Sequence, residues 1–259
     1  MHLVPPAPSV IEPLRFSRLK LMGRSPAHYA AHVSEESAAM ETGTAADAIL
    51  LGGQKVLAYP GPVRRGKEYE AFCAMNPGAL IVTQKEGAIA LGIAEAVHAC
   101  PDAVRLLTGI RQHTMRWDFQ GRACRGTPDV RGDGYLTDLK TGETSDPRFF
   151  PFKVRRFAYH AAMAWYETGV ALAGLPPVTQ SYIVAVEQAP PHVVTIYRLT
   201  ERSIELGARL WRLWFEQLQV CEAGGTFPPY SQSIVDLDMN DDEEAFDIGD
   251  ATEAVESTR

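Results

Sequence analysis

The hydrophobic pattern of the chain changes its period near residue 110. Before this point, apolar residues recur with helical spacing over residues 85–100, an alanine-rich amphipathic segment that Pro101 ends. Beyond it, strand-like segments separated by glycine-containing turns predict three consecutive strands at residues 113–119, 122–130 and 135–140. The pattern therefore predicts an α/β fold in which a helix leads into a three-stranded meander.

Further elements flank this meander on both sides. Residues 54–83 look irregular, and the upstream pattern predicts short helices at residues 16–22, 25–33 and 45–51. Downstream, the pattern predicts a helix at about 148–168, strands at 178–187 and 192–199, and a helix from Thr200 to about Ala223. After Tyr230 the sequence turns acidic, so we expect one domain over residues 1–230 and a disordered tail over 231–259.

The composition is that of an ordinary globular protein. Hydrophobic residues make up 46% of the 259 and charged residues 22%, and there is no run of about 18 apolar residues that would span a membrane. The N-terminus lacks the basic region and apolar core of a signal peptide, so we expect a cytoplasmic protein without membrane contact. The four cysteines lie far apart, which favours reduced thiols over a zinc ribbon, a disulfide scaffold or an iron–sulfur cluster.

The net charge of −7 is unusual for a protein that binds nucleic acid, but its distribution is uneven. Residues 236–259 hold ten acidic side chains and one basic one, which leaves 22 acidic and 24 basic residues in 1–235, a net charge of +2. A nearly neutral body is compatible with a DNA groove lined locally by arginine and lysine.

Residues 126–141 carry the chemistry that can be read from the chain. Asp129 ends one predicted strand, and Asp138 and Lys140 lie on the next, so a tight hairpin places the two carboxylates side by side. Because side chains alternate along a strand, Asp138 and Lys140 point to the same face. An aspartate in a turn is common, but a strand inside a meander rarely carries an acid and a lysine on one face without use.

Such a cluster suits the hydrolysis of a phosphodiester bond. Two neighbouring carboxylates repel each other, and a divalent cation with a preference for hard oxygen ligands, Mg²⁺ or Mn²⁺, relieves the repulsion. The metal acidifies a water molecule and stabilises the charge that develops on the phosphate. Lys140 can orient or deprotonate the attacking water, or pair with the phosphate.

These residues resemble a known signature. Pro128-Asp129 followed by Asp138-Leu139-Lys140 resembles the PD…D-x-K motif of the PD-(D/E)XK nuclease superfamily, with Asp138 where glutamate is more frequent. The chain resembles in particular the exonuclease VIII-like domain of phage and prophage recombination exonucleases, over about residues 14–230. The segments that carry this resemblance are residues 16–20, 25–29, 40–45, 124–129, 138–141 and 159–166.

The resemblance implies a restriction-endonuclease-like core of αβββαβ order, with a mixed sheet flanked by helices. It implies a metal-dependent nuclease that acts on ends of double-stranded DNA, with Asp129, Asp138 and the carbonyl of Leu139 as metal ligands. It also implies a homo-oligomer, and a single-strand annealing recombinase as a partner.

Two positions depart from the family pattern. The first core helix usually carries a histidine metal ligand, and Asp47 stands in its place. Asp47 is either a harder ligand for the same ion or a surface aspartate of the helix. The helix after the lysine usually carries a glutamine, and Ala162 stands there instead, which removes a contact to DNA or water and puts full activity in doubt.

Six further side chains are candidate DNA contacts: Arg125, Lys153, Arg155, Arg156, Tyr159 and Tyr166. The cations of the helix after the active strand can reach phosphates beside the cleaved bond, or they form a solvated helix face. The two tyrosines lie about two turns apart on one face. They can bind a phosphate, stack on a base or pack in the core.

The sequence therefore predicts a Mg²⁺-dependent exodeoxyribonuclease that digests linear double-stranded DNA in phage-type recombination or repair. Two alternatives remain open at this point. The first is an endonuclease or single-strand-specific nuclease of the same superfamily. The second is a catalytically degenerate nuclease fold that binds DNA or a partner protein.

Overall fold

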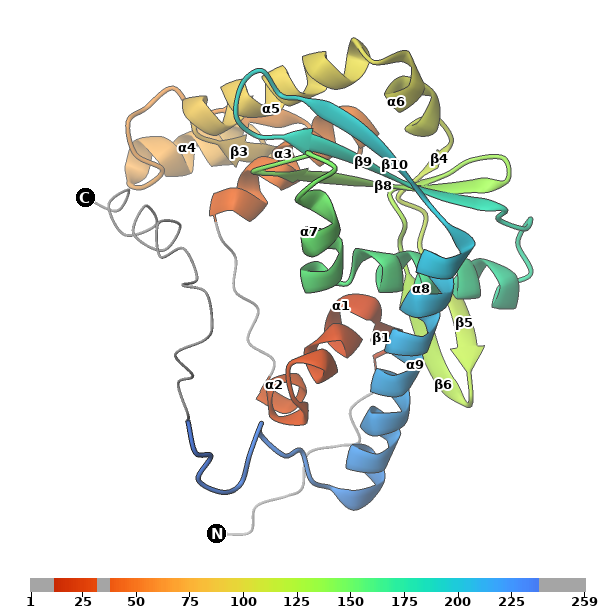
Figure 1. Cartoon of the computed structure of the whole chain (residues 1–259). Helices are drawn as coiled ribbons and strands as arrows, with labels where there is room; N and C mark the ends of the chain where they lie inside the picture. Colours follow the sequence, from red (N-terminus) through yellow and green to blue (C-terminus); the bar gives the residue numbers. More distant parts are fainter. Residues whose placement is uncertain (1–11, 32–37, 238–259) are drawn as a thin grey trace, which may run out of the picture.

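The computed structural model describes residues 12–31 and 38–237, with the backbone alone over 38–41 (Figure 1). A five-stranded mixed sheet forms its centre, built from β4 (Ile110–Arg111), β7 (Val130–Arg131), β8 (Tyr135–Gly142), β9 (Gln180–Glu187) and β10 (Val194–Leu199). The strands lie in the order β10-β9-β8-β7-β4. β8 pairs antiparallel with β7 and parallel with β9, so the strand that carries Asp138 and Lys140 is the middle one.

Helices cover both faces of this sheet. One face packs on α3 (Ala38–Leu51), α5 (Gln84–His98) and α6 (Pro101–Leu106), and the other on α8 (Tyr159–Leu172) and α9 (Glu201–Gly224). Leu139 belongs to the first core and Leu136 to the second, as the alternation of side chains along β8 requires. Asp138 and Lys140 therefore share the face of Leu136, toward α8.

Capping residues explain where two of the long helices begin and end. Thr83 accepts a hydrogen bond from the amide of Glu86, whose side chain accepts one from the amide of Thr83, and this reciprocal pair starts α5. Thr200 is the N-cap residue of α9, where its side chain accepts a hydrogen bond from the amide of Ser203. Gly225, with a φ of 63°, ends this helix. The predicted boundaries of these two helices agree with the structure within two residues.

The predicted three-stranded meander is wrong, because its strands belong to two sheets. β5 (Met115–Phe119) and β6 (Arg122–Gly126) form a separate three-stranded sheet with β1 (Leu14–Arg15), and they extend beyond the central sheet in Figure 1. The predicted strand at 122–130 is broken at residues 127–129, where Pro128 lacks the amide hydrogen that a ladder needs. The chain passes from one sheet to the other at this point.

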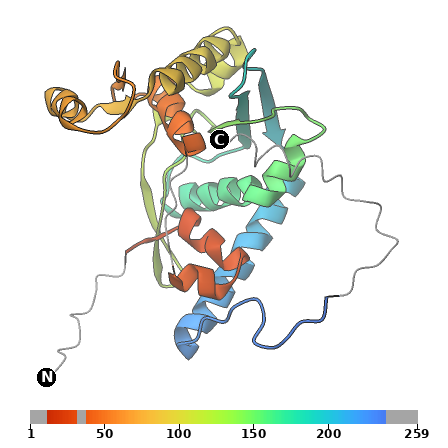
Figure 2. The ribbon, with the colours of Figure 1, turned by 90° about the vertical axis from the view of Figure 1, so that its left-hand side faces the viewer.

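Residues 54–83 are not irregular, contrary to the prediction. They contain two short parallel strands, β2 (Val56–Ala58) and β3 (Leu80–Val82), joined through α4 (Lys67–Met75), which projects from the body of the molecule in Figure 2. Strands of three residues are too short to show an alternating pattern.

The predicted helix at 148–168 is two helices, α7 (Phe150–Phe157) and α8. Ala158 joins them with a φ of 56°, in the left-handed region, where a helix cannot continue. Alanine is not a typical residue for this conformation, so the sequence gives no signal of the break. α3 likewise begins at residue 38 rather than 45.

The remaining N-terminal elements are short. They are α1 (Phe16–Leu19), the 3₁₀ helix η1 (Lys20–Gly23) and α2 (Pro26–Ala31), which lie where the sequence predicts helices. None of the helices within the described ranges is long and apolar enough to cross a membrane. Residues 231–237 form no helix or strand, and residues 238–259, the rest of the predicted tail, lie outside the described residues.

Candidate active site

A cleft of about 1020 Å³ opens beside the end of β8. Its walls come from α1, η1, α3, α7 and α8, and its lining includes Asp47, Asp138 and Lys140. Three acidic side chains and six basic ones line the cleft: Asp47, Asp138, Glu143, Arg15, Lys20, Arg125, Lys140, Lys153 and Arg156. The cleft is therefore locally basic although the whole chain is acidic.

Asp129 lies at the joint between the two sheets, directly before β7. The register pairs Val130 with Thr137, so Asp129 stands opposite Asp138 across the hairpin, as the sequence predicts. The amide of Leu139 donates a hydrogen bond of 2.7 Å to Oδ2 of Asp129 and fixes this carboxylate against β8. Burial, together with the charge of Asp138, raises the pKa of Asp129 well above its ordinary value.

Asp138 and Lys140 are in direct contact. The ammonium nitrogen of Lys140 lies 2.6 Å from Oδ2 of Asp138 and 3.2 Å from the carbonyl oxygen of Leu139. Asp138 is 5% exposed, and an acid so deeply buried requires a charged partner. Burial alone would lower the pKa of Lys140, but the carboxylates of Asp138 and Asp129 outweigh it and raise this pKa above its ordinary value.

Asp47 reaches the same cleft from α3. Burial raises its pKa to about 6, while Lys140 lowers the pKa and Asp138 raises it further. These electrostatic couplings place Asp47 beside the other charged groups and not on an outer surface of the helix. The glycine at 43 allows the close approach of α3, because a Cβ there would lie 3.1 Å from Oγ1 of Thr141 on β8.

Lys20 is a cleft residue that the sequence analysis did not single out. It lies at the start of η1, and burial together with the nearby charge of Lys140 lowers its pKa. Within the described residues, no carboxylate forms a salt bridge with Lys20. Its place in the cleft wall follows from the packing of η1 on α9, and only the resemblance of segment 16–20 to the family pattern could have drawn attention to it.

The predicted DNA contacts divide into two groups. Lys153 and Arg156 of α7 line the cleft, and so does Arg125 of β6. Arg155 does not line it, because α7 turns that side chain outward to solvent, near His160. The sequence predicts Arg155 beside the active site, but in the structure it lies outside the cleft.

Both predicted tyrosines line the cleft. The ring centroid of Tyr159 lies 5.3 Å from the ammonium of Lys140, a cation–π contact. Burial raises the pKa of Tyr166, and the charge of Asp138 raises it further. Tyr166 also packs over Gly126, where a Cβ would lie 2.9 Å from its ring.

The sequence matches the family described as "PDDEXK-like domain of unknown function (DUF3799)" over residues 15–237. The chain belongs to this PDDEXK-like family. The predicted membership of the PD-(D/E)XK superfamily and the predicted mixed α/β fold class are thus confirmed. No curated protein matches the chain.

A solved structure with a TM-score above 0.5 supports the same fold. A crystal structure of a protein called "Putative exonuclease", from Eubacterium rectale, superposes with a TM-score of 0.63 at 14% identity and covers 88% of this chain and 91% of its own. At this identity the likeness concerns the fold alone. The structure of SSO0001, also 14% identical, covers 74% of this chain and 84% of its own with a TM-score of 0.27.

The candidate site offers oxygen donors of the kind that a hard divalent cation prefers. Asp129, which is half-buried, and Asp138, which is buried, are brought together where a cation would offset their repulsion, and Leu139, with its carbonyl oxygen, directly follows Asp138 in the chain. The described residues hold no group of three His, Cys, Asp or Glu side chains close enough to form a complete metal site. In this arrangement the ammonium of Lys140 contacts two of the predicted ligand oxygens.

Ala162, where the superfamily usually has glutamine, lines the cleft, so the missing amide would have faced this space. Another amide does reach the cleft: Gln188, beyond the end of β9, donates to Oγ1 of Thr141 at 3.4 Å.

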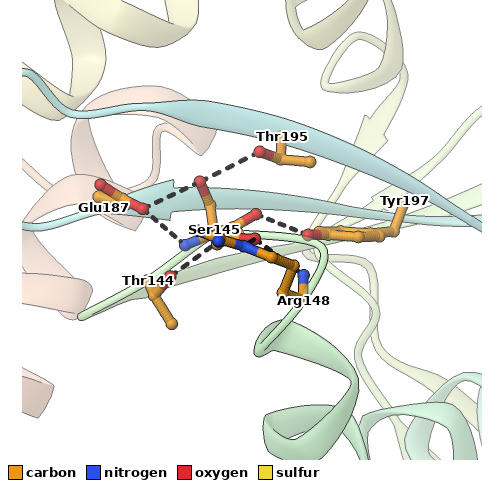
Figure 3. Close-up of polar contacts among 7 residues, drawn as sticks. Thr144, Ser145, Arg148, Glu187, Thr195 and Tyr197 are labelled. Atoms are coloured by element: carbon orange, nitrogen blue, oxygen red, sulfur yellow. Dashed lines mark hydrogen bonds and ion pairs between the residues drawn. The ribbon is translucent and has the colours of Figure 1, made fainter.

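Ser145 ties the loop between β8 and α7 to the neighbouring hairpin (Figure 3). Its amide donates to Oε1 of Glu187 at 2.9 Å, and its carbonyl oxygen accepts from the hydroxyl of Tyr197 at 2.6 Å. Its buried hydroxyl donates to the carbonyl of Val193 at 3.2 Å and accepts from Thr195 at 3.1 Å. These contacts hold the loop before α7 against the β9–β10 hairpin. They thereby hold α7, and with it Lys153, beside the cleft.

Proposed function

We propose that this PDDEXK-like protein is a metal-dependent DNA nuclease with Asp129, Asp138 and Lys140 at its catalytic centre. The observation that carries the proposal is the contact between Asp138 and Lys140 in a basic cleft, with Asp129 held beside them by the amide of Leu139. Salt bridges on a protein surface rarely combine burial, mutual repulsion of two acids and an adjoining cleft, whereas catalytic centres often do.

The reaction is the hydrolysis of a phosphodiester. A water oxygen attacks phosphorus, the ester bond on the opposite side breaks, and the leaving oxygen takes up a proton. A divalent cation held by Asp129, Asp138, the carbonyl of Leu139 and Asp47 would polarise the water and neutralise developing charge. The oxygen-only ligand set favours Mg²⁺, with Mn²⁺ as a substitute.

The protein groups have separate roles in this proposal. The amide of Leu139 holds Asp129 in one orientation through its 2.7 Å hydrogen bond. The two carboxylates favour the charged form of Lys140, so we assign it as a hydrogen-bond donor that orients the attacking water and the scissile phosphate. Lys20, Arg125, Lys153 and Arg156 supply positive charge for the flanking phosphates.

Double-stranded DNA with free ends is the substrate that we favour. The structural neighbour from Eubacterium rectale carries the name "Putative exonuclease", and the superposition covers most of both chains. The sequence resemblance points the same way, toward an exodeoxyribonuclease in phage-type recombination or repair. A homo-oligomer and a single-strand annealing recombinase as a partner belong to the same proposal, and sedimentation of the purified protein tests the first of them.

Digestion of two DNA forms tests the proposal. End-labelled linear duplex and covalently closed circular DNA are incubated with Mg²⁺, with Mn²⁺ and with EDTA. The wild-type chain is compared with Lys140→Ala and with Lys85→Ala, which removes an exposed lysine of α5. We expect metal-dependent loss of the linear duplex only, abolished by Lys140→Ala and retained by Lys85→Ala.

Other outcomes contradict parts of the proposal in different ways. Cutting of the closed circle would make the protein an endonuclease with the same centre. DNA binding without hydrolysis in either metal would indicate the degenerate fold, for which Ala162 in place of glutamine is the specific observation.

A further inference from the structure

α7 exposes large aromatic rings to solvent. Phe149, the residue before the helix, is 54% exposed, and Phe152, in its first turn, is 64% exposed. Residues separated by three and by seven positions share one side of a helix, so Phe149, Phe152 and Arg156 lie on a common face. We call these three residues the outer face of α7.

The packing of the helix does not use these rings. On the opposite side Phe150 is buried and stacks on Tyr197 with their ring centroids 4.5 Å apart, and Val154 packs against the same core. The guanidinium of Arg148 lies 5.4 Å from the ring centroid of Phe149, and within the described residues no other aromatic ring stacks on Phe149 or Phe152. Two large apolar rings that stay exposed on one helix face forgo the stabilisation that burial would give, so a role outside the core is indicated.

The outer face adjoins the candidate active site. Lys153, Arg156 and Phe157 of the same helix line the cleft that holds Asp138 and Lys140. In Figure 1, α7 lies between the central sheet and α1, the two sides from which the cleft is built. A strand that leaves the cleft along α7 would therefore pass over the exposed rings.

The charges of α7 fit a polyanion. The helix carries Lys153, Arg155 and Arg156 and no acidic side chain. Of the cations near its start, Arg148 pairs with Asp146 at 2.6 Å, and Lys153 lies 3.6 Å from the exposed Glu143. Within the described residues no salt bridge engages Arg155 or Arg156, which leaves both guanidinium groups available to phosphates.

We propose that the outer face of α7 binds an unpaired stretch of the DNA substrate beside the cleft. The rings of Phe149 and Phe152 stack on unpaired bases, and Arg156 contacts the phosphates between them. This proposal rests on the proposed nuclease function and narrows its substrate to DNA whose end is single-stranded or opened. In a closed duplex the base faces are covered by their neighbours, so exposed rings beside the groove have no base to stack on.

The charge of α7 favours DNA over a protein occupant. Arginine and aromatic residues are also frequent at protein interfaces, so the net charge of the helix decides between the occupants: α7 has three cations and no acid, which fits a polyanion. A nucleic acid strand instead offers an aromatic base and an anionic phosphate in every nucleotide, which matches this arrangement.

Binding measurements without hydrolysis test the inference. The full chain, in EDTA, is titrated by fluorescence anisotropy with three labelled DNAs: a single strand, a duplex with an unpaired tail, and a blunt duplex of equal length. The variant is Phe149→Ser/Phe152→Ser, and the matched control is Leu213→Ser, which removes a side chain of α9 that is 60% exposed. Thermal melting establishes that both variants are folded.

We expect the double variant to bind the single strand and the tailed duplex at least about tenfold more weakly, and the blunt duplex within about twofold of wild type. The control should bind all three as wild type does. Equal affinity of variant and wild type for the tailed duplex would overturn the inference. So would equal weakening on all three DNAs, or a change in the sedimenting mass of the variant, which would make the face a contact between copies of the chain.

Digestion of the same DNAs with Mg²⁺ separates this inference from the proposed function. If wild type digests DNA but the phenylalanines do not affect binding, the nuclease stands and the outer face does not. If wild type hydrolyses nothing but binds the tailed DNA through Phe149 and Phe152, the outer face stands and the catalytic assignment fails.

Discussion

The ammonium of Lys140 lies 2.6 Å from Oδ2 of Asp138, and the same nitrogen contacts the carbonyl of Leu139. These are two of the oxygens that we propose as metal ligands. The lysine therefore neutralises Asp138 in the metal-free protein, and a divalent cation bound as we propose would have to displace it. Metal binding at this centre would therefore compete with the contacts that Lys140 makes to the same oxygens.

Lys140→Met should separate metal binding from cleavage. Without the competing ammonium, the full chain should bind Mn²⁺ several-fold more tightly, while cleavage of linear DNA falls at least about 100-fold because the donor to water and phosphate is gone. Isothermal titration with Mn²⁺ and end-label digestion measure the two effects. Weaker Mn²⁺ binding in the variant would show that Lys140 supports the metal site instead of competing for it.

Asp129→Asn and Asp138→Asn should abolish cleavage and weaken Mn²⁺ binding at least tenfold, since each replaces a hard anionic ligand by a neutral amide. Both variants should bind DNA in EDTA at least as tightly as wild type, because they remove negative charge beside the phosphates. Glu205→Gln, an exposed acid of α9, serves as the control. Retained cleavage by either aspartate variant would remove that residue from the centre.

Asp47→Asn should stabilise the metal-free protein at neutral pH. Burial raises the pKa of Asp47 to about 6, so its ionised form costs folding free energy above that pH and the cost disappears as the pH falls toward the unfolded value. Urea unfolding in EDTA should show the variant more stable at pH 7.5, on the order of 2 kcal/mol, with no difference at pH 4. A difference that does not change with pH would show that the carboxylate is not the cause.

Lys20→Met should weaken DNA binding without destabilising the fold. Partial burial and the nearby charge of Lys140 both lower the pKa of Lys20, so its ammonium does not stabilise the free protein. The charge becomes favourable only when an anionic ligand binds beside it. We expect the slope of log affinity against log salt to fall by about one, and Lys20→Arg to restore it. If Lys20→Met lowers the melting temperature and leaves the slope unchanged, Lys20 has a structural role.

Tyr197→Phe tests the contacts of Ser145 in Figure 3. The change removes the donor to the carbonyl of Ser145 and should cost about 1–2 kcal/mol of stability. It should also weaken DNA binding, because the loop that positions Lys153 is loosened. Tyr230→Phe, at a tyrosine 73% exposed, should change neither quantity in the same unfolding and anisotropy measurements. An unchanged affinity despite the loss of stability would limit the loop to a structural role.

The sequence predicts the local arrangement of the candidate centre well, for reasons that are themselves local. A turn at residues 131–134 and the alternation of side chains in β8 are enough to place Asp129 opposite Asp138, with Lys140 on the same face. The place of Asp47 in the cleft required more, namely the resemblance to a family in which a ligand stands at that position. The chemical roles of all four residues remain predictions.

The features that the sequence missed depend on distant contacts. Nothing near Ala158 marks the break between α7 and α8, because the left-handed conformation there is imposed by the packing of two helices and not by glycine. Lys20 enters the cleft through the packing of η1 on α9, which no local pattern predicts. The exposure of Phe149 and Phe152 is equally invisible, since phenylalanine in an amphipathic segment normally predicts a core position.

The contacts of Ser145 imply that the chain tolerates insertions at some positions and not at others. Because its amide and its carbonyl are both held by the β9–β10 hairpin, the stretch 143–149 has a fixed length, and one added residue would detach Ser145 or rotate α7 away from Asp138. The loop at 61–66, before the projecting α4, is largely exposed. A fluorophore tag or a fusion domain for following this protein on DNA therefore belongs in that loop, where it leaves the spacing between strand and helix unchanged.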